Sequence, residues 1–173
     1  MTVNETAETY TARILSFLGG REPLPILSST AARLRQLIEG RTREELSRTP
    51  DPAHWSVGQI LAHLADSEIV GAWRLRSILA SDGITLQPYD PDTWSETFRY
   101  VDADPHESVE LFATNRAATL ALLRRVDQGL HANHGLHAER GEESVEYLIR
   151  LYAGHDLNHV VQIERLLDVS GSV

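Results

Sequence analysis

The chain has 173 residues, a formal net charge of −9, eight histidines and no cysteine. A length of this order is typical of a single domain, here residues 1–173, with a core large enough to fold without disulfides. The missing cysteines exclude disulfide scaffolds, thiolate metal sites and a cysteine nucleophile, and the acidic balance argues against nucleic acids and anionic membranes as partners.

Residues 1–20 are interpreted as an N-terminal extension. The first ten residues are polar and acidic rather than signal-like, and Tyr10 to Leu18 is predicted to form a short helix before Gly19 and Gly20. No apolar run in the sequence approaches the roughly 18 residues that a membrane-spanning helix needs. We therefore expect a cytoplasmic protein that does not enter a membrane.

Two long helices are predicted in the first half of the chain. The first runs from Pro23 to Glu39, since proline suits an opening turn and Gly40 suits the position after a helix end. The second begins after Ser56, which can form a capping box with Gln59, and extends to about residue 81. A further capping box at residues 42–45 predicts one or two helical turns between them.

Two more long helices are predicted in the second half. Asp104 and Pro105 begin the third as N-cap and first helical residue, and this helix extends to about residues 128–129. The fourth begins near residues 141–143, where acidic side chains suit the positive end of a helix, and extends to about Asp168.

Residues 83–103 separate the second and third long helices and contain Pro88 and Pro91. We interpret this segment as a long crossover loop, which allows two successive helices to run parallel. The predicted fold is therefore all-α, a four-helix bundle with at least one crossover.

Two histidines fall on the predicted buried face of the fourth helix. Steps of three and four residues from Val145 pass through Leu148, Tyr152, His155 and His159. Because His155 and His159 are four residues apart, they share one helical face, where two imidazoles can converge on one ion. The alternative is a pair of hydrogen-bonded structural histidines, although imidazoles buried without partners are costly.

A third histidine reaches the same depth if the second and fourth helices are antiparallel. His63 lies about 10 Å along its helix from Ser56, and His159 lies about 14 Å before its helix ends at Asp168. His63, His155 and His159 can then meet inside the bundle. Three neutral imidazoles leave a position open for water or substrate, as in catalytic metal sites, and zinc, nickel and iron all accept imidazole.

The segments around these histidines resemble a known family. Residues 54–68, HWSVGQILAHLADSE, and residues 153–163, AGHDLNHVVQI, resemble the second- and fourth-helix motifs of the DinB-like, or YfiT-like, superfamily of metal-dependent enzymes. The crossover sequence at residues 87–94, QPYDPDTW, is similar to the loop of that family. The likeness extends in order over about residues 20–168.

The resemblance implies more than the spacing does. It implies up-down-down-up connectivity, the ligands His63, His155 and His159, and one divalent ion, with nickel or zinc first and iron or manganese next. It also implies a homodimer, and either transfer of a low-molecular-weight thiol to a small molecule or hydrolysis. The acidic chain offers no basic surface to support a nucleic-acid role, so we expect a small-molecule substrate.

Four further side chains are candidates for the site. Asp66, three residues after His63, is a candidate to orient a ligand imidazole or accept a proton, and a plain surface or interhelical carboxylate is the alternative. Arg116, on the inward face of the third helix, is expected to pair with a carboxylate or clamp an anionic substrate, unless it extends to the bundle edge. Tyr89 and Tyr152 are candidates for the pocket wall, with simple packing as the alternative.

A second group of histidines has a more ordinary explanation. Gly129 and Gly135 place His131, His134 and His137 in a predicted loop, where we interpret them as solvated or packing residues.

The sequence thus predicts a divalent-metal-dependent enzyme whose three-histidine site activates water or a small-molecule thiol for hydrolysis or transfer. Because the chain has no cysteine, any thiolate must come from outside the protein. The alternative from another class is a non-catalytic helical bundle that binds a metal or a small ligand.

Overall fold

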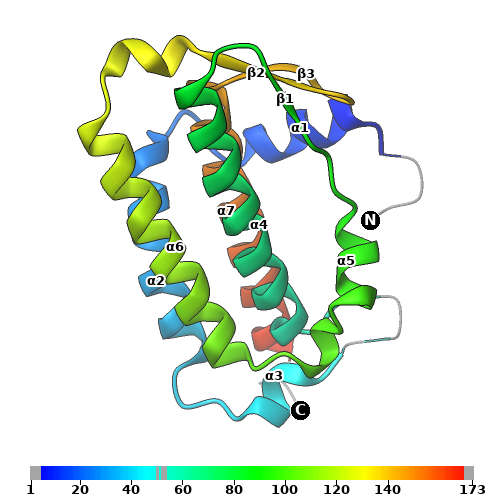
Figure 1. The fold of residues 1–173 in the computed structure, drawn as a ribbon. Coiled ribbons are helices and arrows are strands. Elements are labelled where there is room, and N and C mark those ends of the chain that lie inside the picture. Colours follow the sequence, from blue (N-terminus) through cyan, green and yellow to red (C-terminus); the bar gives the residue numbers. More distant parts are fainter. Residues whose placement is uncertain (1–4, 50, 52–53, 170–173) are drawn as a thin grey trace.

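The computed structural model describes residues 5–49, 51 and 54–169. Four long helices form a bundle: α2 (Pro23–Ile38), α4 (Val57–Ala80), α6 (Pro105–Arg125) and α7 (Val145–Val169). α2 and α7 run in one direction and α4 and α6 in the other, so the crossover joins a parallel pair (Figure 1). Both α4 and α2 pack against α6 and α7, which confirms the up-down-down-up bundle.

Side-chain caps fix where two of these helices begin. The Ser56 hydroxyl accepts a hydrogen bond from the backbone N–H of Gln59, and the Gln59 side chain accepts one from the N–H of Ser56. Asp104 accepts from the N–H groups of His106 and Glu107, and Pro105 follows it at the first helical position. Proline suits this position because a first-turn N–H has no partner within the helix. Both helices begin where the sequence predicts.

Shorter helices pack around the four-helix bundle. α1 (Ala7–Ser16) packs against α7, and α3 (Arg43–Ser47) begins at the predicted capping box of Thr42 and Glu45. Two 3-10 helices, η1 (Tyr100–Asp102) and η2 (Gln128–Ala132), precede and follow α6. α6 ends before the predicted residues 128–129, because Asp127 accepts a hydrogen bond from the N–H of Gly129 and begins η2.

The crossover is more ordered than a loop. Residues 83–103 contain strand β1 (Ile84–Leu86), helix α5 (Pro91–Thr97) and η1. Asp90 caps α5 by accepting from the N–H groups of Asp92 and Thr93, with Pro91 as the first helical residue. The same Asp-Pro pattern begins α6, so Pro91 starts a helix inside the segment that the sequence predicts to be a loop.

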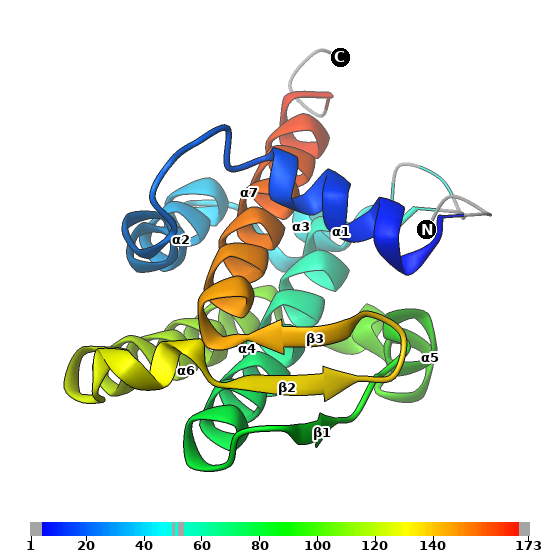
Figure 2. The same cartoon turned by 90° about the horizontal axis from the view of Figure 1, so that it is seen from above.

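A small sheet is the part of the fold that the all-α prediction lacks. β2 (His134–His137) pairs in parallel with β1 and antiparallel with β3 (Gly141–Ser144), and the three strands lie side by side near α4 and α7 in Figure 2. Residues 134–137 are thus a strand rather than a loop. α7 begins at Val145 rather than at residues 141–143, because the Ser144 hydroxyl accepts from the N–H of Tyr147 and caps the helix there.

Two apolar clusters fill the interior and meet along α7. One includes Val145, Leu148 and Ala153 with the end of α4, and the other includes Ile163 with the start of α4 and the first half of α6. The segment of α7 between the clusters carries the two histidines predicted to face inward. Among the described helices, none combines the length and apolar character needed to cross a bilayer.

Candidate metal centre

Three histidines meet inside the bundle, one from α4 and two from α7. The Nε2 atom of His155 lies 3.1 Å from Nε2 of His63 and 3.1 Å from Nε2 of His159. The ring centroids are 4.5 to 5.2 Å apart, and each pair of rings is steeply tilted. Because α4 and α7 are antiparallel, residues at these two heights come together, as the spacing predicts.

The surroundings keep these imidazoles neutral. The side chains of His63, His155 and His159 are buried, with 5%, 8% and 9% of their residue surface exposed. Burial lowers the pKa of His63 and of His155 well below the ordinary value, and the neighbouring histidines lower both further. Burial lowers the pKa of His159 to about 4. At neutral pH all three rings therefore have a nitrogen lone pair to offer.

Hydrogen bonding among the three rings cannot satisfy the nitrogens that face one another. A neutral imidazole nitrogen carries either one proton or one lone pair, so Nε2 of His155 can make a hydrogen bond to only one of its two neighbours. His159 donates through Nδ1 to Oε1 of Gln162 at 3.0 Å, which leaves its Nε2 with a lone pair. Whichever tautomers His63 and His155 adopt, at least one of the two 3.1 Å contacts then lacks a matched donor and acceptor in a buried place.

A divalent ion fits this donor set. Zinc–imidazole bonds of about 2.0–2.1 Å in a tetrahedral arrangement place ligand nitrogens about 3.4 Å apart, close to the observed 3.1 Å. Candidate ligand atoms of His63, His155 and His159 all lie within 4.8 Å of one another. The Nε2 atoms are the ones suited to binding, because Nε2 of His155 lies close to Nε2 of both other rings, whereas Nδ1 of His63 is buried without a hydrogen-bond partner within the described part of the chain.

Residues one turn away hold the rings in place. Gln162 follows His159 by three residues on α7, and its amide oxygen fixes which nitrogen of His159 carries the proton. Ser67 follows His63 by four residues on α4, and its Oγ lies 3.4 Å from Nε2 of His63 and 2.7 Å from the Tyr89 hydroxyl. Trp55 packs against the His63 ring, with centroids 5.1 Å apart.

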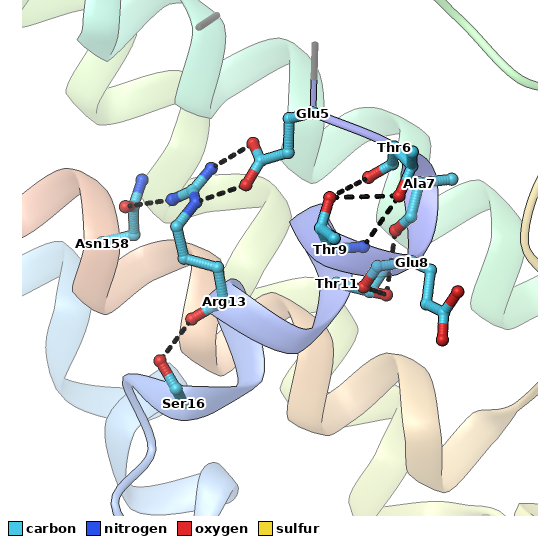
Figure 3. A network of polar contacts seen from close by, with 9 residues as sticks. All are labelled: Glu5, Thr6, Ala7, Glu8, Thr9, Thr11, Arg13, Ser16 and Asn158. Atoms are coloured by element: carbon cyan, nitrogen blue, oxygen red, sulfur yellow. Dashed lines mark hydrogen bonds and ion pairs between the residues drawn. The ribbon is translucent and has the colours of Figure 1, made fainter.

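The three histidines lie in the wall of a cavity of about 560 Å³. The cavity is bounded by α1, α4, the crossover, the turn between β2 and β3, and α7. Arg13 of α1 forms part of this wall, where it pairs with Glu5 at 2.8 Å and donates to Asn158 of α7 at 3.1 Å (Figure 3). The volume is typical of a site for a small molecule.

The two candidate tyrosines are both in the cavity wall. The Tyr89 hydroxyl contacts Ser67, and its ring lies against Trp94 with centroids 4.5 Å apart. Burial raises the pKa of Tyr89, so its hydroxyl keeps its proton. The Tyr152 ring centroid is 6.4 Å from that of His155, and the ring covers Gly71, where a side chain would meet it at 2.5 Å.

Asp66 and Arg116 make contacts away from the three imidazoles. Asp66 Oδ2 accepts a hydrogen bond of 2.7 Å from the Tyr100 hydroxyl, which fastens η1 to α4. Arg116 forms buried ion pairs with Glu68 at 2.8 Å and with Asp156 at 2.6 Å. Neither Asp66 nor Arg116 is among the residues that line the described cavity. Asp156 is a carboxylate partner of the kind that a core arginine requires.

Ser67, Gln162 and Arg74 also belong to the cavity wall, although the sequence pattern alone predicts no role for them. The spacing of Ser67 and Gln162 could have predicted their place near the site, since each is three or four residues from a predicted ligand on the same helical face. The sequence indicates the position of Arg74 less clearly, because this residue is eleven residues beyond His63 and reaches the cavity wall through its long side chain.

Comparison with known proteins places this centre in a family. Residues 26–163 match the family model described as the DinB superfamily. A relative named "Putative metal-dependent hydrolase YfiT", from Bacillus subtilis, is 28% identical over 144 residues, covering 83% of this chain and 81% of the relative. Another, "Putative metal-dependent hydrolase OB0782" from Oceanobacillus iheyensis, is 26% identical over 133 residues, covering 77% of each chain.

The solved structure of YfiT from Bacillus subtilis, described as having "an unusual four-helix bundle topology", has the same fold. It superposes with a TM-score of 0.78 at 24% sequence identity, covering 99% of this chain and 93% of that one. The family match spans most of the bundle and includes all three converging histidines. The chain therefore belongs to the DinB superfamily.

Proposed function

We propose that the protein is a divalent-metal-dependent enzyme that hydrolyses a small molecule, with His63, His155 and His159 as its metal ligands. The observation that carries the proposal is the meeting of three neutral Nε2 atoms in the wall of a small-molecule cavity. Three protein ligands leave coordination positions for a reactant, as in catalytic rather than structural sites. Relatives named as metal-dependent hydrolases support the same chemistry.

A bound divalent ion supplies Lewis-acid activation of a water or thiol nucleophile. The chain's own residues orient the imidazoles and bind the reactant. Gln162 keeps the proton of His159 on Nδ1, and the hydroxyl groups of Ser67 and Tyr89 are hydrogen-bond partners for a reactant beside His63. Nickel or zinc is the ion we propose first, with iron or manganese next, since each accepts imidazole ligands. A small-molecule thiol is the alternative nucleophile, and it must come from outside because the chain has no cysteine.

The test is an activity screen on protein stripped of metal and reloaded with nickel or zinc. The substrates are aryl esters and anilides, each assayed with and without cysteine, and 1-chloro-2,4-dinitrobenzene as an electrophile for thiol transfer. We expect hydrolysis that is lost on chelation, restored by the metal, and lowered at least a hundredfold in His155→Ala. His106→Ala is the matched control, since His106 lies on the surface and contacts the backbone oxygen of Arg41.

Three results would replace the proposal. Turnover that requires cysteine assigns thiol transfer instead of hydrolysis. Metal binding at the histidines without turnover of any substrate in the screen assigns a non-catalytic binding protein. Activity that survives both chelation and the His155→Ala change means that the three histidines are not the reactive centre.

A further inference from the structure

Arg74 is a buried cation in the cavity wall whose hydrogen bonding is incomplete. The residue is 4% exposed, and its Nη2 donates to the backbone oxygen of Gln87 at 2.7 Å. Its Nε is buried and has no acceptor among the residues that the structure describes. The guanidinium also lies over the Tyr89 ring, 5.9 Å from its centroid. A buried guanidinium with five N–H donors normally has more acceptors than this.

His137 approaches Arg74 as a potential acceptor but cannot act as one. Nη2 of Arg74 lies 3.4 Å from Nε2 of His137. Nδ1 of His137, however, accepts a hydrogen bond from the N–H of Glu139 at 3.2 Å. A neutral imidazole has a single accepting nitrogen, so Nε2 carries the proton and turns a donor toward the guanidinium. Arg74 therefore has fewer acceptors than its contacts suggest.

The other arginines of the cavity wall are already neutralised. Arg13 pairs with Glu5 at 2.8 Å, and Arg140 pairs with Glu143. Within the described part of the chain, no carboxylate forms an ion pair with Arg74. Arg74 is thus a positive charge in the cavity wall that no described carboxylate contacts directly, although Asp92 and Glu139 belong to the same wall. A single charge of this kind suits a monoanion better than a doubly charged group.

The position of Arg74 fits an anionic group at the far end of a bound molecule. His63, Ser67 and Arg74 lie on one face of α4, and Arg74 is about 16 Å of helix rise from His63. Helical side chains point back toward the N-terminus, so the guanidinium approaches the imidazoles along that face. The Tyr89 side chain bridges the space between Ser67 and Arg74, because its hydroxyl contacts Ser67 while the Arg74 guanidinium lies over its ring.

We propose that Arg74 binds a carboxylate, and that the substrate carries this carboxylate a few carbon atoms from the bond that reacts at the three histidines. The planar fork of a guanidinium matches the two oxygens of a carboxylate, and the ligand supplies the acceptors that Arg74 lacks. The second half of this proposal depends on the proposed function. The carboxylate site itself does not depend on it.

The test compares binding of butanoate and butanamide to the protein by isothermal titration calorimetry, both zinc-loaded and stripped of metal. The two probes have the same shape and differ in charge. We expect wild type to bind butanoate at least tenfold more tightly than butanamide in both forms. Arg74→Gln should abolish that preference without changing zinc content, and Arg74→Lys should keep part of it. Arg35→Gln is the matched control, since Arg35 pairs with Glu110 on the surface and does not line the cavity.

The outcomes separate this site from the metal chemistry. Equal affinity for the two probes in wild type overturns the proposal and needs no variant. A butanoate preference that is present only with zinc, and that survives Arg74→Gln, means that the metal holds the carboxylate. A preference that depends on Arg74 in metal-free protein supports the carboxylate site even if the activity screen finds no hydrolysis.

Discussion

At the scale of single residues, the centre depends on which nitrogen of each imidazole carries a proton. Gln162 determines this for His159, because an amide oxygen can only accept and so holds the proton on Nδ1. The Nε2 lone pair then faces the other two rings. Within the described part of the chain, His63 has no such partner on Nδ1, so packing against Trp55 orients it instead.

Gln162→Ala is therefore expected to weaken metal binding about 10–100-fold, the usual effect of losing a residue that orients a metal-bound histidine. The Kd for zinc, measured by competition with a chromophoric chelator, checks this. Gln162→Glu keeps an acceptor for Nδ1 and should bind zinc at least as tightly as wild type. Unchanged affinity in the alanine variant would show that the ring is held by packing alone.

The role of a single residue can be predicted from the sequence when it depends on spacing along one helix, and not when it depends on contacts between helices. His155 and His159 follow from four-residue spacing on one apolar face, and His63 follows from its distance to a helix cap. The partners of Arg116 do not follow, because Glu68 and Asp156 lie on two other helices and their meeting depends on how each helix is rotated about its axis. Arg74 escapes prediction for the same reason.

At the scale of elements, caps account for the helix starts that the sequence predicts and for those that it misplaces. Asp104 and Ser56 are both predicted, since their side chains bond to N–H groups two or three residues later. Asp90 and Ser144 do the same for α5 and α7, but the sequence does not predict these two caps. Asp90 lies in a proline-containing segment interpreted as a loop, and Ser144 follows acidic residues that predict an earlier helix start. The sheet could not be predicted, because its strands have only three or four residues and β1 pairs with β2 from the other side of α6 in the sequence.

Asp104 gives the α6 cap a pH dependence. Hydrogen bonds from the N–H groups of Glu107 and His106 lower the pKa of Asp104 below its ordinary value of 3.8. The charged carboxylate gains these bonds only on folding, so its stabilisation is complete above pH 3.8 and declines as the pH falls through the lowered pKa.

Asp104→Ala should lower the free energy of unfolding at pH 7 by about 1 kcal/mol, measured by urea denaturation. The gap to wild type should narrow below pH 3.8, where wild type loses its charged cap. Asp104→Asn keeps an acceptor but does not titrate, so it should lie close to wild type at pH 7. A gap that stays constant down to the lowest pH at which the chain remains folded would contradict this account.

The packing of α1 on α7 depends on Gly154. A Cβ at this position would collide with the backbone oxygen of Ile14 in α1, which cannot move aside as a side chain does. Alanine is otherwise favoured over glycine inside a helix by about 1 kcal/mol. Gly154→Ala should nevertheless destabilise the fold by about 1–3 kcal/mol through overpacking, and speed hydrogen exchange in α1. A gain in stability would mean that α1 adjusts without strain.

At the scale of the whole molecule, one side chain links all four helices of the bundle. Arg116 of α6 pairs with Glu68 of α4 and Asp156 of α7, and its Nη1 donates to the backbone oxygen of Leu27 in α2 at 3.0 Å. Asp156 is next to His155 in sequence, so this network also holds the helix that presents two of the imidazoles. The buried contacts of Arg116 therefore connect the packing of the four helices to the three-histidine centre.

Arg116→Met should cost about 3–5 kcal/mol of unfolding free energy, because it leaves two buried carboxylates without a cation. Arg35→Met provides the comparison, since Arg35 pairs with Glu110 on the surface and its loss should cost far less unfolding free energy. Urea denaturation of both variants measures the difference. Similar losses in the two would show that the buried network adds little to the fold.

The central claim is that three histidines from two antiparallel helices hold one divalent ion. The most direct measurement is the zinc or nickel content of reloaded protein, by inductively coupled plasma mass spectrometry, for wild type, for the triple alanine variant of His63, His155 and His159, and for His106→Ala. We predict about one ion per chain in wild type and in His106→Ala, and none retained by the triple variant. Equal metal content in the folded triple variant and wild type would contradict the account.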